Sequence, residues 1–336
     1  MTEQADSGTM LEPIKASMLL ELEGERSLDR QAASSHSLPV AHPNGIFLPG
    51  LDKRFGSVWA GGHVVGVGSL GEVDGATPGK RSLPLHVLAT ALLSSNARAP
   101  GPDTLPNIYI IAPHALQTVP MLHALLANMI SDSQAAIELL KTVRLLQYFD
   151  LAGIAESVAE VSDNVYRDSQ KHEGRCETGP FRNIVLVQGI CPTVYATYRR
   201  SNLLQANALL ASLGRNITQL SRSSGDTLVI VELLVEMEEA DDMQQKQDAV
   251  RPRTARSMAL DPSFLGPMGE TLRVASCHET LAKTLAASLD RVVAVHDGLG
   301  RITSDKSRKG SQDLVIEVIK DRSGTLTGLW GVLKEA

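Results

Sequence analysis

The stretch that decides the fold is GGHVVGVGSLGEVDGATPGKRS, residues 61–82. Its apolar run, HVVGVG at 63–68, is followed by a glycine-rich segment and then by Gly79 and Lys80 at the expected start of a helix. A strand, a glycine-rich loop and a helix start, in this order, present backbone N–H groups that cradle phosphate oxygens, while a lysine reaches the terminal phosphates. The stretch therefore predicts a phosphate-binding loop within an α/β fold.

The match to the phosphate-binding pattern G-x-x-x-x-G-K-[ST] is partial. Gly79 and Lys80 are in place, but Asp74 stands at the first glycine position, and Gly75 follows one position late. An aspartate there would put negative charge beside phosphate oxygens. A Gly/Pro-rich surface loop between a strand and a helix is therefore the alternative interpretation of this stretch.

The hydroxyl that holds magnesium in such a loop is also displaced by one position. Arg81 follows the lysine directly, and an arginine cannot bind magnesium, whereas Ser82 comes one position later. ATP is the candidate cofactor, and no metal site is expected beyond the magnesium that accompanies a nucleotide. The candidate nucleotide-binding residues are Gly75, Gly79, Lys80, Arg81 and Ser82.

Strand-like and helix-like runs alternate along the chain. This alternation predicts an α/β fold with a mostly parallel, doubly wound sheet. Three later strand-like runs, at 289–296, 314–320 and 326–333, predict antiparallel strands at a C-terminal edge of that sheet. The other expected strands are 63–68, 107–112, 143–149, 183–187 and 227–231, and the expected helices are 83–95, 118–129, 151–166 and 201–222.

Changes in composition along the chain indicate how it is organised. Residues 1–37 begin with acids and serines and predict a flexible N-terminal tail, with one short helix at 10–23. From residue 38 the chain becomes denser in glycine and apolar residues, so 38–336 is the expected core domain. Within that domain, residues 236–267 are first acidic and then basic, and they predict a long surface loop.

The overall composition excludes several classes of protein. Hydrophobic residues make up 43% of the chain and charged residues 21%, which suits a globular domain with a sizeable core. The net charge of −6 excludes a generally basic, nucleic-acid-binding surface. The three cysteines form no C-x-x-C pair, which disfavours a zinc site or a disulfide framework. With neither a signal pattern nor an apolar run of about 18 residues, we expect a soluble intracellular protein without a membrane partner.

Four segments resemble the RecA/RadA recombinase family in their order and spacing. They resemble, in turn, the opening of the family's core, the strand after the phosphate-binding loop, the Walker B strand with the segment after it, and the following helix. The resemblance spans residues 48–333, is closest to the eukaryotic recombinase paralogues, and implies a RecA-like P-loop core. The segments are LPGLDKRF at 48–55, NIYIIAPHAL at 107–116, NIVLVQGICPTVYATYRR at 183–200 and LLASLGRNITQL at 209–220.

Residues that carry chemistry in that family are replaced here. The family's activating glutamate falls at Pro113, its Walker B aspartate at Gln188, and the serine after that aspartate at Gly189. The polar sensor of the next strand falls near Glu232. Phosphoryl transfer depends on such groups for positioning and charge neutralisation, and losing one lowers the rate by ~10²–10³. The resemblance therefore implies degenerate Walker motifs and a pseudo-ATPase, and it leaves nucleotide binding open.

The same resemblance points to candidate DNA contacts. The family grips DNA with loops after the Walker B strand and after the next strand, which correspond here to 198–200 and 236–267. The alternative for the second loop is a solvated surface segment, because its acids offset its positive charge. The candidate DNA-binding residues are Arg199, Arg200, Arg251, Arg253 and Arg256.

The function implied by the resemblance is that of a recombinase paralogue in homologous recombination and DNA repair. Such a protein would bind other RecA-type subunits on single-stranded DNA in the nucleus, with weak or no ATP hydrolysis. One alternative is a DNA-dependent ATPase with a rearranged loop, in which Lys80 and Ser82 do the work. Another is a RecA-like regulatory module that does not act on DNA.

Overall fold

The computed structural model describes residues 45–70, 82–98, 105–114, 116–171, 183–223, 225–238, 260, 271–297 and 314–333. The predicted tail, residues 1–37, lies outside these ranges. Most of the predicted loop at 236–267 also lies outside them, but residues 236–238 belong to a strand.

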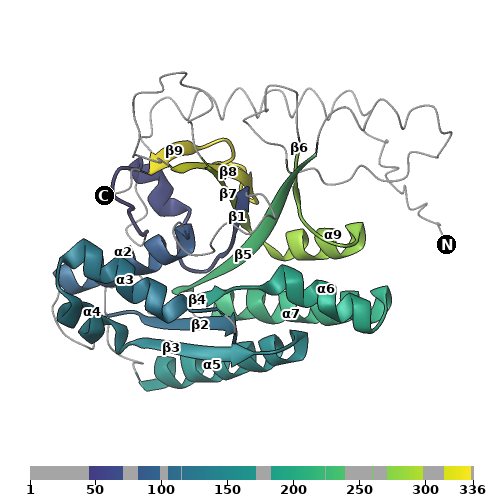
Figure 1. Ribbon diagram of the computed structural model, residues 1–336, viewed down its shortest axis with the longest axis horizontal. Coiled ribbons are helices and arrows are strands. Elements are labelled where there is room, and N and C mark those ends of the chain that lie inside the picture. Colours follow the sequence, from purple (N-terminus) through teal and green to yellow (C-terminus); the bar gives the residue numbers. More distant parts are fainter. Residues whose placement is uncertain are drawn as a thin grey trace, which may run out of the picture. The chain divides into compact units, whose positions relative to one another are not determined.

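Among the described residues, nine strands form one sheet in the order β3-β2-β4-β5-β1-β7-β8-β9, with β6 beside β5 (Figure 1). β3, β2, β4, β5, β1 and β7 all run parallel to one another. β8 and β9 are antiparallel additions at the C-terminal edge, and β6 pairs antiparallel with β5. The strands are β1 Val64–Leu70, β2 Asn107–Pro113, β3 Val143–Tyr148, β4 Asn183–Val187, β5 Thr227–Glu238, β6 Thr271–Val274, β7 Arg291–Asp297, β8 Leu314–Asp321 and β9 Trp330–Leu333.

This arrangement confirms the predicted fold class, an α/β protein whose sheet is mostly parallel and has antiparallel C-terminal edge strands. One detail differs. The run at 289–296 was expected to be an antiparallel edge strand, but β7 pairs parallel with β1 and antiparallel with β8. The reason is a helix that the sequence pattern did not reveal. β6 runs antiparallel to β5, back towards the amino ends of the strands, and α9, Glu279–Ser288, continues the chain to the start of β7, which therefore runs parallel to β1.

Helices cover both faces of the sheet. One face packs against α2, α3 and α4 together with the 3₁₀ helix η1, and the other packs against α5, α6, α7 and α9 (Figure 1). The central strands serve both layers, because successive side chains point to opposite faces. In β2, Ile108 and Ile110 join the first cluster, whereas Tyr109 and Ile111 join the second. The remaining bounds are η1 Lys53–Ser57, α2 Leu83–Arg98, α3 Thr118–Ile130, α4 Ser133–Leu140, α5 Leu151–Lys171, α6 Ile190–Arg200 and α7 Leu203–Ser223.

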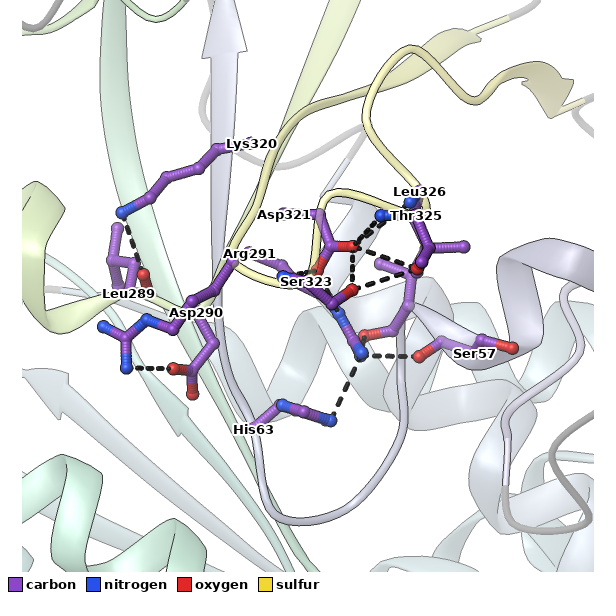
Figure 2. Close-up of polar contacts among 12 residues, drawn as sticks. Ser57, His63, Leu289, Asp290, Arg291, Lys320, Asp321, Ser323, Thr325 and Leu326 are labelled. Atoms are coloured by element: carbon purple, nitrogen blue, oxygen red, sulfur yellow. Dashed lines mark hydrogen bonds and ion pairs between the residues drawn. The ribbon is translucent and has the colours of Figure 1, made fainter. Parts of the chain in front are cut away.

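Charged side chains gather at the amino ends of β1 and β7, around Arg291 (Figure 2). The Arg291 guanidinium donates to Asp321 Oδ1 at 3.2 Å and to the backbone oxygens of Ser57 and Val58 at 2.6 and 3.1 Å. It also lies 3.2 Å from Nε2 of His63. This one side chain therefore connects the segment before β1 to the end of β8.

The two carboxylates of this cluster are buried and fully engaged. Asp321 accepts from the backbone N–H groups of Thr325 and Leu326, both at 3.1 Å, and so closes the turn after β8. Asp290 accepts from the backbone N–H of Val64 at 3.0 Å. It also pairs with two arginines, Arg222 at 3.2 Å and Arg322 at 3.0 Å. Burial is tolerated here because each carboxylate has cationic and backbone partners.

Candidate functional site

The candidate site lies at the opposite end of the parallel strands, at the carboxyl end of β4 and beside Glu232 in the middle of β5. In open α/β sheets, ligands bind at this edge. β5 lies between β4 and β1, with Val231 opposite Val187 and Glu232 opposite Val67. Gln188, the first residue after β4, is therefore a neighbour of Glu232. Glu232 is in turn beside β1, the strand that leads into the glycine-rich segment.

Gln188 is held by hydrogen bonds at both ends of its amide. Thr118, the first residue of α3, donates its hydroxyl to Gln188 Oε1. Gln188 Nε2 donates to Glu232 Oε2 at 3.1 Å. Both Gln188 and Thr118 are buried. The position that corresponds to the family's Walker B aspartate is thus an uncharged amide, whose oxygen and one of whose N–H groups are already in use.

Glu232 is the carboxyl group closest to that position in the chain of hydrogen bonds. Burial raises its pKa above the ordinary value, and the hydrogen bond from Gln188 only partly offsets this. Burial without a cationic partner disfavours the ionised form of a carboxyl group. No three His, Cys, Asp or Glu side chains gather into a metal-binding group anywhere in the described part of the chain.

A second set of contacts fixes the turn between β4 and α6. The Tyr148 hydroxyl, at the end of β3, donates to the backbone oxygen of Gln188. Gly189 has a φ of 70°, and a Cβ atom there would lie 2.8 Å from the Tyr148 hydroxyl oxygen. Thr193 donates to the Gly189 oxygen at 2.8 Å. The family resemblance expects a serine at this position. A serine here would strain the backbone, and its Cβ atom would lie too close to the Tyr148 hydroxyl oxygen.

The end of β2 likewise lacks the acid that the family uses. Pro113 ends the strand, and its carbonyl oxygen accepts from Leu116 N at 3.0 Å. The next residue, His114, stacks on Phe149 with ring centroids 5.9 Å apart. A proline has no group that can polarise an attacking water. β2 therefore ends in a residue without a proton-accepting side chain, and the loss of a general base stays a prediction.

Comparison with solved structures gives neighbours of similar fold. The chain is similar in fold to the crystal structure of the RadB recombinase, with a TM-score of 0.45 and 15% sequence identity, over 82% of this chain and 87% of that one. No protein-family model matches the chain, and no curated protein matches it. A similarity at this level does not transfer an activity, a ligand or a partner.

Of the predicted nucleotide-binding residues, Ser82 lies within the described ranges. Its carbonyl oxygen accepts from His86 N at 3.2 Å, so it stands at the start of α2, which begins at Leu83. The helix thus begins at Leu83, as predicted for the helix at 83–95, whereas the phosphate-binding pattern had placed a helix start at Gly79 and Lys80. The Ser82 hydroxyl is buried and has no hydrogen-bond partner among the described residues. The other four predicted residues, Gly75, Gly79, Lys80 and Arg81, lie outside the described ranges.

Of the predicted DNA contacts, Arg199 and Arg200 are described, and both are exposed in the last turn of α6. Cations are favourable there because the helix dipole is negative at its C-terminus. The Arg199 guanidinium lies 5.9 Å from the ring centroid of Tyr195. DNA binding by these arginines stays a prediction. Arg251, Arg253 and Arg256 lie outside the described residues.

The sequence prediction missed Thr118 and Tyr148, which support Gln188. Each stands at a junction next to the carboxyl edge, one at the start of α3 and the other at the end of β3. Polar residues at the ends of neighbouring parallel strands are the signal that could have indicated them. None of the described helices combines the length and apolar character that crossing a membrane requires.

Proposed function

We propose that this chain is a recombinase-paralogue-like protein of homologous recombination and DNA repair. It acts as a binding partner of other RecA-type subunits on single-stranded DNA, with weak or no ATP hydrolysis, and it works in the nucleus. The observation that carries the proposal is the Gln188 amide, hydrogen-bonded to Thr118 and Glu232 where the resemblance expects a metal-steadying acid. The order of the RecA-like segments supports the recombination role.

The physical argument against efficient hydrolysis is one of missing charge. Phosphoryl transfer needs a cation to neutralise the developing negative charge and a group to orient the attacking water. At this edge an amide and a carboxyl group with a raised pKa replace the acid that steadies the cation. Pro113 replaces the group that would orient the water. Together these replacements account for a chain that binds partners without turning over ATP at a useful rate.

The edge of β3 supports a role in docking. Among the described strands, β3 is the last on its side of the sheet, so its outer backbone groups have no neighbouring strand. Leu145 is 40% exposed and Phe149 is 85% exposed there. A groove of about 590 Å³ lies beside them, between β3 and α5. An open strand edge flanked by apolar side chains is a template for pairing with another chain.

The experiment that tests the docking role is recovery of RecA-type subunits with the tagged chain from cells. We expect the wild-type chain to recover at least one such subunit, and Phe149→Asp to reduce the recovery about tenfold. Tyr166→Asp is the matched control, because Tyr166 on α5 is also exposed, at 64%, and lies outside the groove. Recovery of no RecA-type subunit by the wild-type chain would sink the recombination assignment.

One observation favours a second candidate, a DNA-dependent ATPase with a rearranged loop. The buried Ser82 hydroxyl at the start of α2 lacks a partner among the described residues, as a group that contacts a ligand would. ATP turnover that single-stranded DNA stimulates, and that both Lys80→Ala and Ser82→Ala abolish, would support this candidate. It would also contradict the pseudo-ATPase proposal.

A further inference from the structure

The groove beside β3 carries charge of one sign. It has a volume of about 590 Å³ and lies where α5 packs back along β3 (Figure 1). Three carboxylates line it, those of Asp150, Glu156 and Glu160. Among the described residues that line it there is no lysine or arginine. This groove, hereafter the β3–α5 groove, is therefore acidic.

Two of the three carboxylates have a defined spacing. Glu156 and Glu160 are both exposed and stand four residues apart on α5, so they share one side of the helix and lie about 6 Å apart along its axis. Neither belongs to the ion pairs of the described residues. Asp150 differs, because it accepts from the backbone N–H of Gly153 at 2.9 Å. Two carboxylates in the groove thus have no cationic partner in the described part of the chain.

β3 presents open backbone groups along the same groove. Ile108 of β2 donates its N–H to the Thr142 oxygen at 3.2 Å. Backbone polar groups of successive strand residues point to opposite sides of the strand, so Val143, Leu145 and Gln147 direct theirs away from β2. The described part of the sheet has no further strand on that side. A second chain can therefore pair there as an added strand.

We propose that the β3–α5 groove binds an extended segment of another protein in which basic and apolar residues alternate. Side chains two residues apart on such a segment point to the same face and lie roughly 6.6 Å apart. This spacing matches that of Glu156 and Glu160, which pair with two successive basic side chains. The apolar side chains point to the other face, beside Leu145, which is 40% exposed. The inference rests on the docking role proposed above for β3, and it names the chemistry of the docked segment.

Charge distinguishes this segment from other occupants of the groove. Carboxylates facing the phosphates of a nucleic acid, or the acids of an acidic peptide, repel them. An uncharged strand can pair with the backbone of β3, but it leaves Glu156 and Glu160 without a counter-charge. The groove therefore selects a cationic segment.

The test measures binding of labelled peptides to the full chain by fluorescence anisotropy. The probe is a peptide of about eight residues, an ordinary strand length, in which arginine and valine alternate. In two controls, glutamate or threonine replaces arginine, and in a third the arginines stand together before the valines. We expect the alternating arginine peptide to bind at least about tenfold more tightly than each control. Its binding should weaken as salt rises from about 0.01 M to about 0.1 M, because both glutamates are exposed and salt screens them.

Charge variants locate the binding on the molecule. Glu156→Lys combined with Glu160→Lys should weaken binding of the alternating arginine peptide about tenfold or more, because two attractions become repulsions. Glu138→Lys combined with Asp163→Lys is the matched control. It changes the net charge equally at exposed residues outside the groove, and it should weaken binding less than about threefold.

A backbone variant tests the added strand. Gln147→Pro removes an N–H that points away from β2, a position where an edge strand tolerates proline. It should weaken binding about tenfold relative to Gln147→Ala, which keeps the N–H. Thermal unfolding shows whether each variant folds, and the charge variants decide the proposal if the proline variant does not.

The outcomes separate the groove chemistry from the recombination assignment. Equal binding of the arginine peptide and any of its three controls, or equal weakening by the two pairs of charge variants, would overturn the cationic segment. If the wild-type chain still recovers RecA-type subunits from cells, only this inference is lost. Binding of the arginine peptide that the groove variants weaken, without recovery of such subunits, would support the groove chemistry and remove the recombination assignment.

Discussion

The two ends of the parallel strands differ in how their buried polar side chains are paired. At the amino ends of β1 and β7, Asp290, Arg291 and Asp321 are buried in a network of ion pairs and backbone hydrogen bonds (Figure 2). Just after the carboxyl end of β4, a buried amide, Gln188, donates to a carboxyl group in the middle of β5, Glu232, whose pKa burial has raised. Buried carboxylates are thus paired with arginines at the amino ends, whereas Gln188 and Glu232 are joined by a hydrogen bond where the resemblance expects ionic groups.

This difference in pairing bears on whether the chain acts as an enzyme or as a binding partner. A buried ion pair is maintained only while both partners are present, because an unpaired buried charge destabilises the folded state strongly. Single substitutions of Asp290, Arg291 or Asp321 at the amino end are therefore expected to destabilise the folded state. At the carboxyl end of β4, the buried Gln188 is joined to Thr118 and Glu232 by hydrogen bonds without an ion pair. This contrast is the ground of our proposal that the chain is a binding partner with weak or no ATP hydrolysis.

The largest expected effect on stability comes from disrupting the ion-pair network at the amino ends of β1 and β7. Arg291→Met should lower the free energy of unfolding by about 3 kcal/mol, because it leaves Asp321 buried without its cation and frees the Ser57 and Val58 oxygens. Urea unfolding followed by circular dichroism measures the change. Arg167→Met, an exposed change on α5, is the control and should shift stability by less than about 0.5 kcal/mol. Equal effects of the two variants would show that the network contributes no stability.

The next effect concerns the turn at the carboxyl end. Gly189→Ala should cost about 2 kcal/mol, because a Cβ atom at φ 70° is strained and lies 2.8 Å from the Tyr148 hydroxyl oxygen. In a Tyr148→Phe background the closest of the steric contacts disappears, while those with Pro113 Cγ and Cδ, at 3.0 and 3.1 Å, remain, so the same substitution should cost less there. A double-mutant cycle by urea unfolding separates the two parts. Purely additive effects would contradict the close contact.

Glu232 should make the stability of the folded chain decrease as pH rises. Its folded-state pKa is raised, so the folded chain loses stability relative to the unfolded chain as pH rises above about 4.5, where the unfolded carboxyl group ionises. Glu232→Gln removes this loss and should stabilise the protein by about 1 kcal/mol at pH 7. The advantage should vanish below pH 4.5. Denaturation between pH 4 and about pH 8 measures it, and an advantage that is independent of pH would contradict the shift.

His63 should give the amino end the opposite, and smallest, pH dependence. Burial and the neighbouring Arg291 lower its pKa below 6.5. Stability should therefore fall as pH drops below 6.5, where the unfolded imidazole takes up a proton and the folded one does not. The effect should stay under about 1 kcal/mol, since His63 is only half-buried and solvent screens it. In His63→Gln the slope near pH 6 should flatten, and an unchanged slope would assign it to another group.

The sequence predicted the fold better than it predicted the site. The strands at 107–112, 183–187 and 227–231 are compact apolar runs, and a parallel sheet buried on both faces requires such runs. β6 and α9 escaped prediction because they are short, and without them the parallel pairing of β7 could not be foreseen. α6 follows β4 after only two residues and has a proline near its start, so its helical pattern was not recognised.

At the site, the sequence located the replaced residues but not their contacts. Gln188 and Glu232 stood out because the resemblance expects polar or acidic groups there. Their hydrogen bond, and the one to Thr118, join residues 44 and 70 positions apart in the sequence. Only the register of β4 beside β5 brings the first pair together. Contacts of this kind depend on strand order, which a single sequence does not reveal.

The central claim is that the carboxyl end no longer supports phosphate chemistry, and steady-state ATP hydrolysis tests it most directly. The wild-type chain, with magnesium and single-stranded DNA, should show no turnover above that of Lys80→Ala. A wild-type rate at least about 10²-fold above that variant, the size of effect that one catalytic group supplies, would contradict the account and return Gln188 and Glu232 to a working ATPase.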